Sequence, residues 1–306
     1  MKKSILLLLL ALVAYGISSI NSKDSADEKD IQNNVSTSAK GSKSPKVNST
    51  ISYELPAPLT NRQEQIVEHT GYTLSYNKDH NTPNWSAWML TKEKTEGTVE
   101  RCRKFWADPK ISQLYRVDYF DYKGSGYDRG HMCPAGDMKW SEAAMHDCFY
   151  MSNMCPQEHA LNNGSWKKLE EACRQWATNE DTIYIICGPV YKGTKHERIG
   201  INHVIDVPEG FFKAVLSLRK GNEKAIGFYY DNSDQRQSMQ HAAMSVDDLE
   251  ELTGIDFFHQ LDDETENRVA SSFSLKEWNA NEDTNQKLAT IITTSIIKVK
   301  LTDSYN

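Results

Sequence analysis

The chain has 306 residues and a net charge of −7, and 39% of its residues are hydrophobic. This apolar content excludes a disordered chain, and no heptad run, Gly-X-Y period or longer repeat indicates a coiled coil, a collagen or a solenoid. The acidic balance argues against a polybasic protein that coats nucleic acid. It leaves room for an enzyme that binds a few phosphates locally while the rest of its surface stays acidic.

The N-terminus carries a pattern typical of a secretory signal peptide. Lys2 and Lys3 precede an apolar run from Ile5 to Val13, and small residues follow. This run is shorter than the roughly 20 apolar residues that a membrane-spanning helix needs. We therefore expect residues 1–20 to be a signal peptide, and the protein to be exported, either periplasmic or secreted, with no membrane anchor after cleavage.

Residues 21–50 consist mostly of Ser, Asn, Asp and Lys. Such a segment buries too little apolar surface to offset the entropy that is lost on ordering, so we predict a disordered linker. Residues 51–306 hold 28 basic and 38 acidic residues, a net charge of −10. We expect them to form one folded domain.

All six cysteines fall in this domain. In an exported protein an even number of cysteines predicts disulfides. No CxxC pair occurs, so a zinc ribbon is not indicated. A thiol nucleophile is the alternative for Cys133, two residues after His131, but export disfavours a free thiol. We therefore expect disulfides among Cys102, Cys133, Cys148, Cys155, Cys173 and Cys187.

Runs of β-branched and aromatic residues predict strands at Asn84–Lys92, Phe149–Met154, Thr182–Cys187, His203–Val207, Phe211–Leu218 and Ala225–Tyr230. Apolar residues at helical spacing predict a helix from about residue 161 to residue 178. Ser245 is expected to cap a second helix at Val246–Leu252, with Gly254 just past its end. Because strands and helices mix without a regular βαβ rhythm, the sequence predicts an α+β fold with a mixed or antiparallel sheet.

The tetrapeptide DRGH, which begins at Asp128, places a carboxylate, a guanidinium and an imidazole within four residues. On a strand, alternation directs Arg129 and His131 to one side, and Gly130 is expected to leave the backbone open to a ligand. Any one of these residues alone is common. The tetrapeptide therefore indicates a candidate site only together with the residues that follow it.

Farther along, Asn162 and Glu170 are eight residues apart on the predicted helix. That spacing is a rise of about 12 Å, with directions about 80° apart, so both side chains can border one cleft. The motifs DRGHMCPAGDM (128–138), SNMCPQ (152–157) and LNNGSWKKLE (161–170) occur in this order. This series resembles the DNA/RNA non-specific endonucleases, the endonuclease G-like group of the ββα-metal nucleases.

The resemblance covers roughly residues 52–260 and implies a ββα-metal active site. His131 matches the general base, which takes a proton from the attacking water. Asn162 matches the single protein ligand of the metal, which suits Mg²⁺, with Mn²⁺ as a substitute. Glu170 matches an acidic residue that orients metal-bound water. The implied activity is hydrolysis of phosphodiester bonds in DNA and RNA, without a preference for either sugar.

Other residues match positions around this centre. The resemblance implies that Arg129 and Arg174 stabilise charge on the phosphate, and that Asp128 and Asn153 are orienting partners. Some relatives have an arginine in the strand position that aligns with Met89. Either another basic residue takes that role here, or the rate and the choice of substrate differ.

The family fold also brings the segments of Cys133 and Cys155 close to one active site, from which we hypothesise a disulfide between them. Three other functions stay open at this point: a phosphodiesterase for small nucleotides, a nucleic-acid-binding module with weak catalysis, and a zinc or thiol hydrolase. The sequence also leaves open the preference for single-stranded or duplex substrates and the oligomeric state, for which a homodimer is one option.

Overall fold

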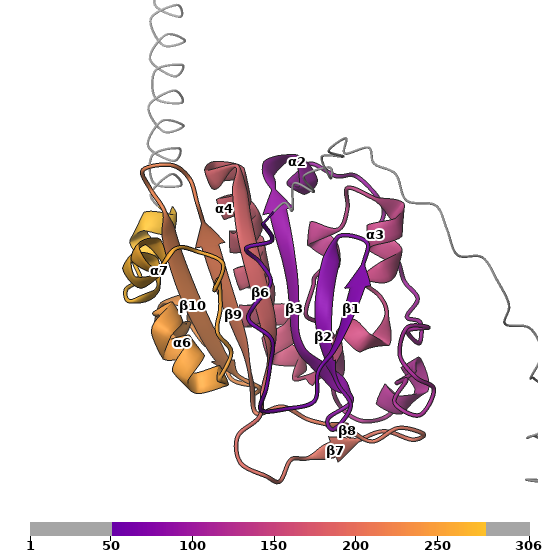
Figure 1. Cartoon of the computed structure of the whole chain (residues 1–306). Helices are drawn as coiled ribbons and strands as arrows, with labels where there is room; N and C mark the ends of the chain where they lie inside the picture. The colour runs from indigo at the N-terminus through magenta and orange to yellow at the C-terminus, as the bar shows by residue number, and fades with distance from the viewer. Residues whose placement is uncertain (1–50, 280–306) are drawn as a thin grey trace, which may run out of the picture. The chain divides into compact units, whose positions relative to one another are not determined.

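The computed structural model describes residues 51–279, whose arrangement is shown in Figure 1. Its centre is a seven-stranded sheet in which neighbouring strands are antiparallel. In spatial order the strands are β1 (Gln65–His69), β2 (Tyr72–Asn77), β3 (Thr82–Thr91), β6 (Thr182–Val190), β9 (Gly210–Ser217), β10 (Lys224–Asp231) and β11 (Ala243–Met244). The predicted α+β class with an antiparallel sheet is confirmed. The predicted signal peptide and linker lie outside the described residues.

Two short antiparallel pairs accompany the sheet: β4 (Asp128–His131) with β5 (Met154–Gln157), and β7 (Arg198–Ile199) with β8 (Ile205–Asp206). The α-helices are α2 (Lys92–Thr95), α3 (Glu142–Asp147), α4 (Lys167–Glu180), α5 (Met239–Ala242), α6 (Val246–Thr253) and α7 (Asp263–Ala270). Three 3₁₀ turns are η1 (Tyr119–Tyr122), η2 (Ala135–Asp137) and η3 (Met151–Asn153). The segment η4 (Leu161–Trp166) is π-helical and continues directly into α4.

Strand alternation divides the hydrophobic core between the two faces of the sheet. On β3, Trp88 and Leu90 belong to the cluster that includes the buried face of α4. The intervening Ala87 belongs to a second cluster, which includes residues of α6 and α7. The helix α4 therefore covers one face of the sheet, and α6 and α7 cover the other (Figure 1).

The structure shifts several predicted boundaries. The predicted helix at 161–178 opens as the π-helical η4 and ends at Glu180. The strand predicted at Phe149–Met154 is displaced to β5, because η3 occupies residues 151–153. The strand predicted at His203–Val207 is reduced to β8.

The strand β6 continues through Gly188 and Pro189, where the sequence predicts its end. Pairing with β3 stops at Cys187, whereas pairing with β9 continues as far as Val190, so the missing N–H of the proline interrupts no ladder on the β3 side. A Cβ atom on Gly188 would lie 2.2 Å from the backbone oxygen of Asn84. Glycine is required there by the close approach of β3.

The predicted caps of α6 are confirmed. The Ser245 hydroxyl accepts a hydrogen bond from the backbone N–H of Asp248, and Gly254 ends the helix in the left-handed conformation, with φ of 65°. Among residues 51–279, no helix combines the length and the apolar character needed to cross a membrane.

All six cysteines are free thiols, so the predicted disulfides, including the Cys133–Cys155 bridge, are wrong. Cys155 pairs with Gly130 in the β4–β5 register, and Cys133 lies beyond the end of β4, where a side-chain amide binds its backbone. Burial raises the pKa of the Cys187 thiol to about 11 and that of Cys173 to about 12. Such thiols stay protonated and pack as small apolar groups.

We expect a thiol titration of the folded protein to show one fast-reacting group, Cys102, and five that react only on unfolding. Five cysteines are at most 1% exposed, whereas Cys102 is half-buried. The measurement is an Ellman titration without reductant, before and after addition of denaturant. Cys102→Ser is the control and should abolish the fast phase. A count below six in denaturant would show that a disulfide exists.

Candidate functional site

A cavity of about 590 Å³ is lined mainly by residues of β4, of η2 and of the continuous helix η4–α4. It brings together five of the seven predicted site residues: Asp128 and His131 from β4, Asn162 from η4, and Glu170 and Arg174 from α4. The antiparallel pair and the helix that follows it thus form a β-β-α unit around one cavity. The other two predicted residues do not line it.

His131 is only 7% exposed, and its Nε2 has no hydrogen-bond partner among residues 51–279. The ring of Phe149 is nearly perpendicular to the imidazole, with centroids 4.7 Å apart. Burial, together with the positive charges of Arg101 and Arg129, lowers the pKa of His131 to about 3. The imidazole is therefore neutral near pH 7 and has a ring nitrogen free to accept a proton, as a general base requires.

Asn162 is held by a carboxylate on the facing strand. Its Nδ2 donates to Oδ2 of Asp128 over 2.9 Å, and Nδ1 of His159 lies 2.8 Å from the same oxygen. The side-chain oxygen of Asn162 makes no hydrogen bond with the described residues, so it is free to bind a cation. The π-helical turn that carries Asn162 belongs to a class of local irregularity that is common at functional sites.

Glu170 and Arg174 follow Asn162 along the same helix. Burial raises the pKa of Glu170 to about 7, although the nearby Lys213 acts in the opposite direction. Nη1 of Arg174 donates to Oδ1 of the buried Asp137 over 2.9 Å. A Cβ atom on Gly136 would lie 2.7 Å from that Nη1, so glycine allows the guanidinium to lie against η2.

Asn153 is fully buried behind the cavity and joins three segments. Its Oδ1 accepts hydrogen bonds from the N–H of Cys133 and the hydroxyl of Ser86, at 2.9 and 3.0 Å. Its Nδ2 donates to the backbone oxygens of Cys133 and Cys148, both at 2.9 Å. Because Cys133 lies two residues after His131, this amide fixes the backbone that leaves β4. Asn153 is placed to position His131 rather than to touch a ligand in the cavity.

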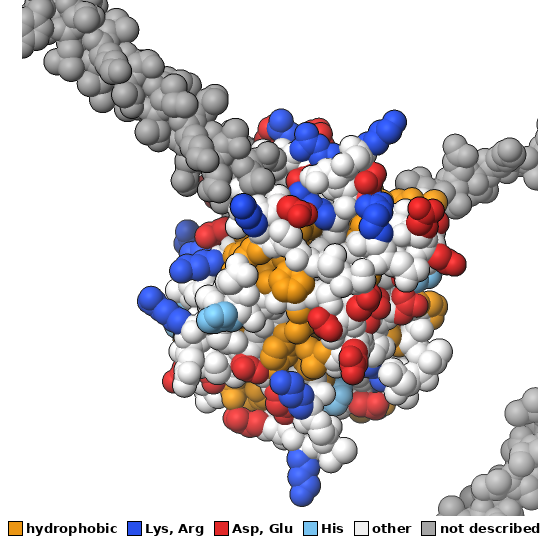
Figure 2. Space-filling view, turned by 90° about the vertical axis from the view of Figure 1, so that its left-hand side faces the viewer, with side chains coloured by type: hydrophobic (Ala, Val, Ile, Leu, Met, Phe, Trp, Pro, Cys, Tyr) orange, Lys and Arg blue, Asp and Glu red, His pale blue; other side chains and the backbone are white. Residues whose placement is uncertain are grey.

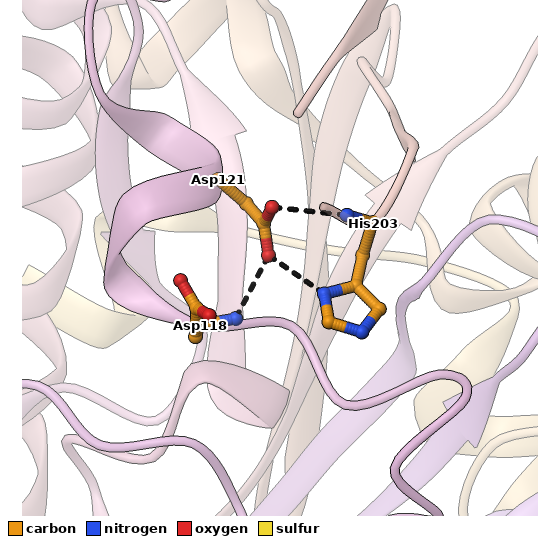
Figure 3. Close-up of side chains that lie close together, drawn as sticks. All are labelled: Asp118, Asp121 and His203. Carbon is orange, nitrogen blue, oxygen red and sulfur yellow. Dashed lines mark hydrogen bonds and ion pairs between the residues drawn. The ribbon is translucent and has the colours of Figure 1, made fainter. Parts of the chain in front are cut away.

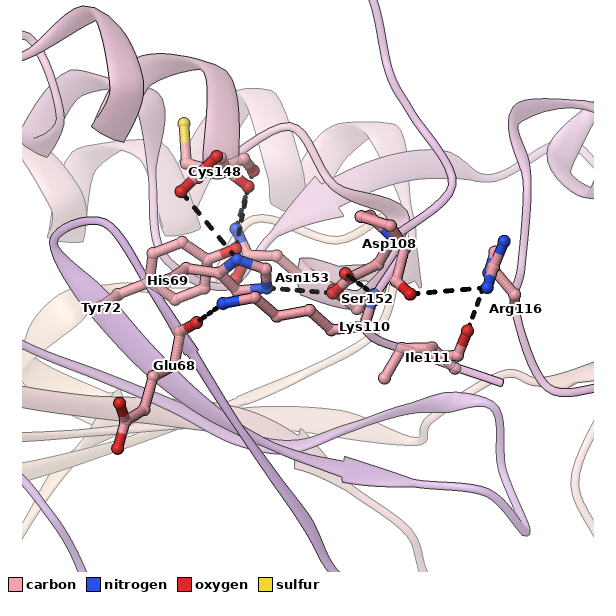
Figure 4. A network of polar contacts seen from close by, with 12 residues as sticks. Glu68, His69, Tyr72, Asp108, Lys110, Ile111, Arg116, Cys148, Ser152 and Asn153 are labelled. Atoms are coloured by element: carbon pink, nitrogen blue, oxygen red, sulfur yellow. Dashed lines mark hydrogen bonds and ion pairs between the residues drawn. The ribbon is translucent and has the colours of Figure 1, made fainter. Parts of the chain in front are cut away.

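A second buried network holds the segment beside Asn153 (Figure 4). Oδ2 of Asp108 accepts from the Ser152 hydroxyl at 2.6 Å and lies 2.9 Å from Nε2 of His69 on β1. Burial alone would raise the pKa of Asp108, but the hydrogen bonds from His69, Ser152 and the N–H of Lys110 hold it below its usual value. The network thereby ties η3, which precedes β5, to the edge of the sheet.

Arg129 lies outside the cavity lining, between two aromatic rings. Its guanidinium carbon is 4.9 Å from the ring centroid of Phe105 and 4.7 Å from that of Tyr119. The role expected for Gly130 is wrong: a Cβ atom there would lie 2.3 Å from Oε1 of Gln157 on β5. This glycine serves the packing of β4 on β5, and it does not open the backbone to a ligand.

Two charged residues near the cavity escaped the sequence analysis. Arg101 lines the cavity, and its guanidinium lies 5.1 Å from the ring centroid of Phe149. It belongs to a basic segment without regular secondary structure, in which Arg101, Arg103 and Lys104 lie close together in sequence. This cluster of basic residues is the feature of the sequence that could have indicated a functional role. Nothing in the sequence pattern indicates that the segment lies near β4.

The other residue is Lys213, which is 1% exposed on β9. Its Nζ lies 5.1 Å from the ring centroid of Trp88 and 4.6 Å from that of Trp166. Burial alone would lower the pKa of Lys213, but the nearby Cys187, Cys173, Glu170 and Asp137 raise it above its ordinary value. The ammonium therefore stays charged although it is buried. A lysine inside the apolar strand GFFKAVLS was the signal in the sequence.

The register of β3 places Met89 away from the cavity. Trp88 and Leu90 contribute to the core cluster on the α4 face, and side chains alternate along the strand. Met89 therefore lies on the opposite face of the sheet. A basic residue, Arg101, does line the cavity, but it comes from a different segment.

Asp118, Asp121 and His203 form a separate cluster with groups suited to a metal (Figure 3). Oδ1 of Asp121 accepts from the backbone N–H groups of residues 201–203, and its Oδ2 accepts from the N–H of Asp118 and lies 2.9 Å from Nδ1 of His203. Both carboxylate oxygens of Asp121 are therefore already engaged by hydrogen bonds. These hydrogen bonds have a structural role, because they hold the loop before β8 against η1.

The helices that cover the other face of the sheet are acidic. The helices there carry seven acidic residues: Asp247, Asp248, Glu250, Glu251, Asp263, Glu264 and Glu266. Figure 2, which faces the side of the molecule where α6 and α7 lie in Figure 1, shows acidic side chains there among basic ones. The cavity on the α4 face has three basic side chains in its lining, Arg101, Lys167 and Arg174, beside the two acidic ones, Asp128 and Glu170. This separation lets an acidic protein present a locally basic site to an anion.

Comparisons with known proteins agree with this geometry. Nuclease EXOG, mitochondrial, from Xenopus laevis is 35% identical over 220 residues, which are 67% of this chain and 61% of that protein. Nuclease C1 from Cunninghamella echinulata var. echinulata is 34% identical over 211 residues, 64% of this chain and 84% of that protein. The chain spans about three fifths of the length of the EXOG proteins it matches.

These relatives overturn the prediction of an exported protein. The EXOG proteins, nuclease 1 from Schizosaccharomyces pombe and endonuclease G are all named as mitochondrial. A basic and apolar N-terminus is shared by more than one kind of targeting segment, so the pattern at residues 1–20 was too weak to establish secretion. The disulfide prediction, which rested partly on export, fails with it.

The fold is similar to that of a solved structure. A chain in the crystal structure of the EndoG/EndoGI complex superposes with a TM-score of 0.62 and 27% sequence identity, covering 69% of this chain and 90% of that one. A sequence model of the family described as DNA/RNA non-specific endonuclease matches residues 50–264. The chain belongs to the DNA/RNA non-specific endonuclease family.

Proposed function

We propose that residues 51–306 form a metal-dependent endonuclease domain that hydrolyses phosphodiester bonds in both DNA and RNA. The observation that carries the proposal is the convergence of His131, Asn162 and Glu170, from two separate elements, on one cavity. Family membership supports the same activity. A base, an oxygen ligand and a carboxylate on a basic background are the groups that hydrolysis of a phosphodiester requires.

His131 acts as the general base in this proposal. Its neutral imidazole accepts a proton from the attacking water. The low pKa of His131 applies when no substrate is bound, because burial and two arginines then disfavour the imidazolium. A phosphate anion beside the ring opposes those positive charges, so it raises the pKa of His131 toward the neutral range as the proton is transferred.

Asn162 would hold the divalent cation through its free side-chain oxygen, with Glu170 orienting water about two turns farther along the helix. The nearby donor groups are amide and carboxylate oxygens, a set that fits Mg²⁺ and Mn²⁺. When bound, the cation supplies positive charge to the scissile phosphate and the leaving oxygen. Asp128 keeps the Asn162 amide oriented through the bond to Nδ2.

Three basic side chains in the lining can contact phosphate oxygens: Arg101, Lys167 and Arg174. Arg174 is held by Asp137, which fixes its orientation while leaving other N–H groups free. Arg129 adds positive charge from behind His131, as the lowered pKa of that histidine shows. These contacts reach the backbone of a nucleic acid and read no base, so we propose cleavage with little sequence specificity.

We expect plasmid DNA and RNA to be cleaved with Mg²⁺ or Mn²⁺ and neither to be cleaved in excess EDTA, because the proposed ligands are hard oxygens. A digestion assay followed on gels checks this. Alkylation of the exposed thiol at Cys102 is the control and should leave the rate unchanged. Full cleavage in excess chelator would exclude the metal-dependent mechanism.

His131→Ala and Asn162→Ala should fail in different ways. Positioned acid–base catalysis contributes about 10²–10⁴-fold, so His131→Ala should lose at least that much in kcat with near-normal Mg²⁺ dependence. Asn162→Ala should also need much more Mg²⁺ to reach its maximum rate. Rate measurements across a Mg²⁺ titration separate the two. A His131→Ala variant that keeps more than about a tenth of the rate would remove the histidine from the mechanism.

The pKa of His131 also predicts how stability depends on pH. The folded value, about 3, lies below the ordinary value of 6.5. As the pH falls from 6.5 toward 3, the unfolded chain therefore binds a proton that the folded protein does not. The wild type should lose stability relative to His131→Gln over that window, by at most about 1.4 kcal/mol per pH unit. Urea unfolding of both proteins in EDTA tests this, and a constant difference between them would contradict it.

A further inference from the structure

An exposed aromatic pair is linked to the candidate catalytic histidine through two intervening side chains, Phe105 and Arg129. Tyr119 and Phe120 of η1 are 45% and 58% exposed. Their rings are nearly perpendicular, with centroids 5.8 Å apart. Neighbouring aromatic rings that remain exposed to solvent are typical of surfaces that bind planar groups.

Contacts between aromatic rings and the Arg129 guanidinium connect this pair to His131. The ring of Phe105 lies 5.8 Å from the imidazole of His131. The guanidinium of Arg129 lies 4.9 Å from Phe105 and 4.7 Å from Tyr119, and Phe120 adjoins Tyr119. We call Phe105, Arg129, Tyr119 and Phe120 the stacking row. It runs from the buried base outward to solvent.

The charge of Arg129 is not neutralised within the described part of the chain. No carboxylate there lies within 4.0 Å of its guanidinium, and its buried Nε has no hydrogen-bond partner. A planar cation held against aromatic rings leaves its N–H groups available to an anion while keeping its orientation. The row therefore offers both flat apolar faces and a free positive charge.

Hydrogen bonds hold η1, the turn that carries the exposed pair. Asp118 and Asp121 form a capping box on η1, in which each side chain accepts a hydrogen bond from the backbone at the other end of the turn. Asp121 also clamps the backbone of residues 201–203. Next to the exposed pair, Tyr122 is 3% exposed and anchors the turn in the core. The aromatic faces are thus held in place before any ligand binds, which limits the entropy lost on binding.

From these contacts we infer that the stacking row binds unpaired bases of a nucleic-acid strand beside the scissile phosphate, so that single-stranded substrates are preferred. This inference rests on the proposed function, because it places the phosphate next to His131. Aromatic rings can stack on a base only when its face is free, and in a duplex both faces are covered by neighbouring base pairs. Arg129 then contacts a phosphate of the same strand.

The test is a binding measurement made without cleavage. Fluorescence anisotropy in EDTA gives the Kd of a labelled single strand of about 12 nucleotides, and of the corresponding duplex. Tyr119→Ala and Phe120→Ala should each raise the single-strand Kd by about tenfold and the duplex Kd by less than about twofold. Tyr119→Phe keeps the ring and should bind like the wild type.

Phe273→Ala is the matched control, because this phenylalanine is also exposed, at 39%, but lies beyond α7 and outside the row. It should change neither Kd. A single strand with abasic positions should bind the wild type about as weakly as the intact strand binds Tyr119→Ala, and that substitution should weaken it no further. Thermal melting at the wild-type temperature shows that each variant is folded.

Equal losses on single strand and duplex, or no loss on either, would overturn the inference. The proposed function fails by a different result, which is that the wild type cleaves neither substrate with Mg²⁺. Because the anisotropy arm needs no turnover, the preference for unpaired bases is decided whether or not cleavage is seen.

Discussion

Three segments that are far apart in sequence converge on the side-chain amide of Asn153, which is fully buried and joins β3, the end of β4 and the segment before β5. An amide satisfied on both its oxygen and its nitrogen stabilises a buried position, whereas its loss would leave backbone groups of Cys133 and Cys148 without this partner. The wall of the cavity that carries His131 therefore depends on Asn153. His131 is positioned by β4, and the chain just beyond β4 is held by the Asn153 amide, which does not line the cavity.

The charged side chains near the cavity and those on the acidic helices lie on different layers of the fold. Lys213 is buried against Trp88 and Trp166, and its positive charge opposes the effect of burial on the pKa of Glu170. The acidic helices α6 and α7 lie across the sheet. A phosphate entering the cavity therefore meets three basic side chains in the lining, Arg101, Lys167 and Arg174, while the acidic groups of α6 and α7 are on the other face of the sheet.

Local sequence patterns predicted the helix that carries Asn162 and Glu170 and the caps of α6. Tertiary contacts decide which other residues line the cavity and whether the cysteines pair. Helical spacing was enough to put Asn162 and Glu170 on one helix, and the caps of α6 were evident from Ser245 and Gly254. Arg101 could not be placed, because its segment has no periodicity and its contact with the cavity is made only in the folded chain. The cysteines show the converse: an even count suggested pairing, yet the β4–β5 register puts Gly130, and not Cys133, opposite Cys155.

The Asp118–Asp121–His203 cluster shows why proximity of ligand-type groups does not by itself indicate a metal. Five hydrogen bonds already converge on Asp121, and three of them come from consecutive backbone N–H groups. A cation would have to displace partners that hold η1 against the loop before β8. The cavity differs: the buried Nε2 of His131 has no partner in the described part of the chain, and the amide oxygen of Asn162 accepts no hydrogen bond there. A buried polar atom without a partner needs an explanation, and a ligand in the cavity supplies one for His131.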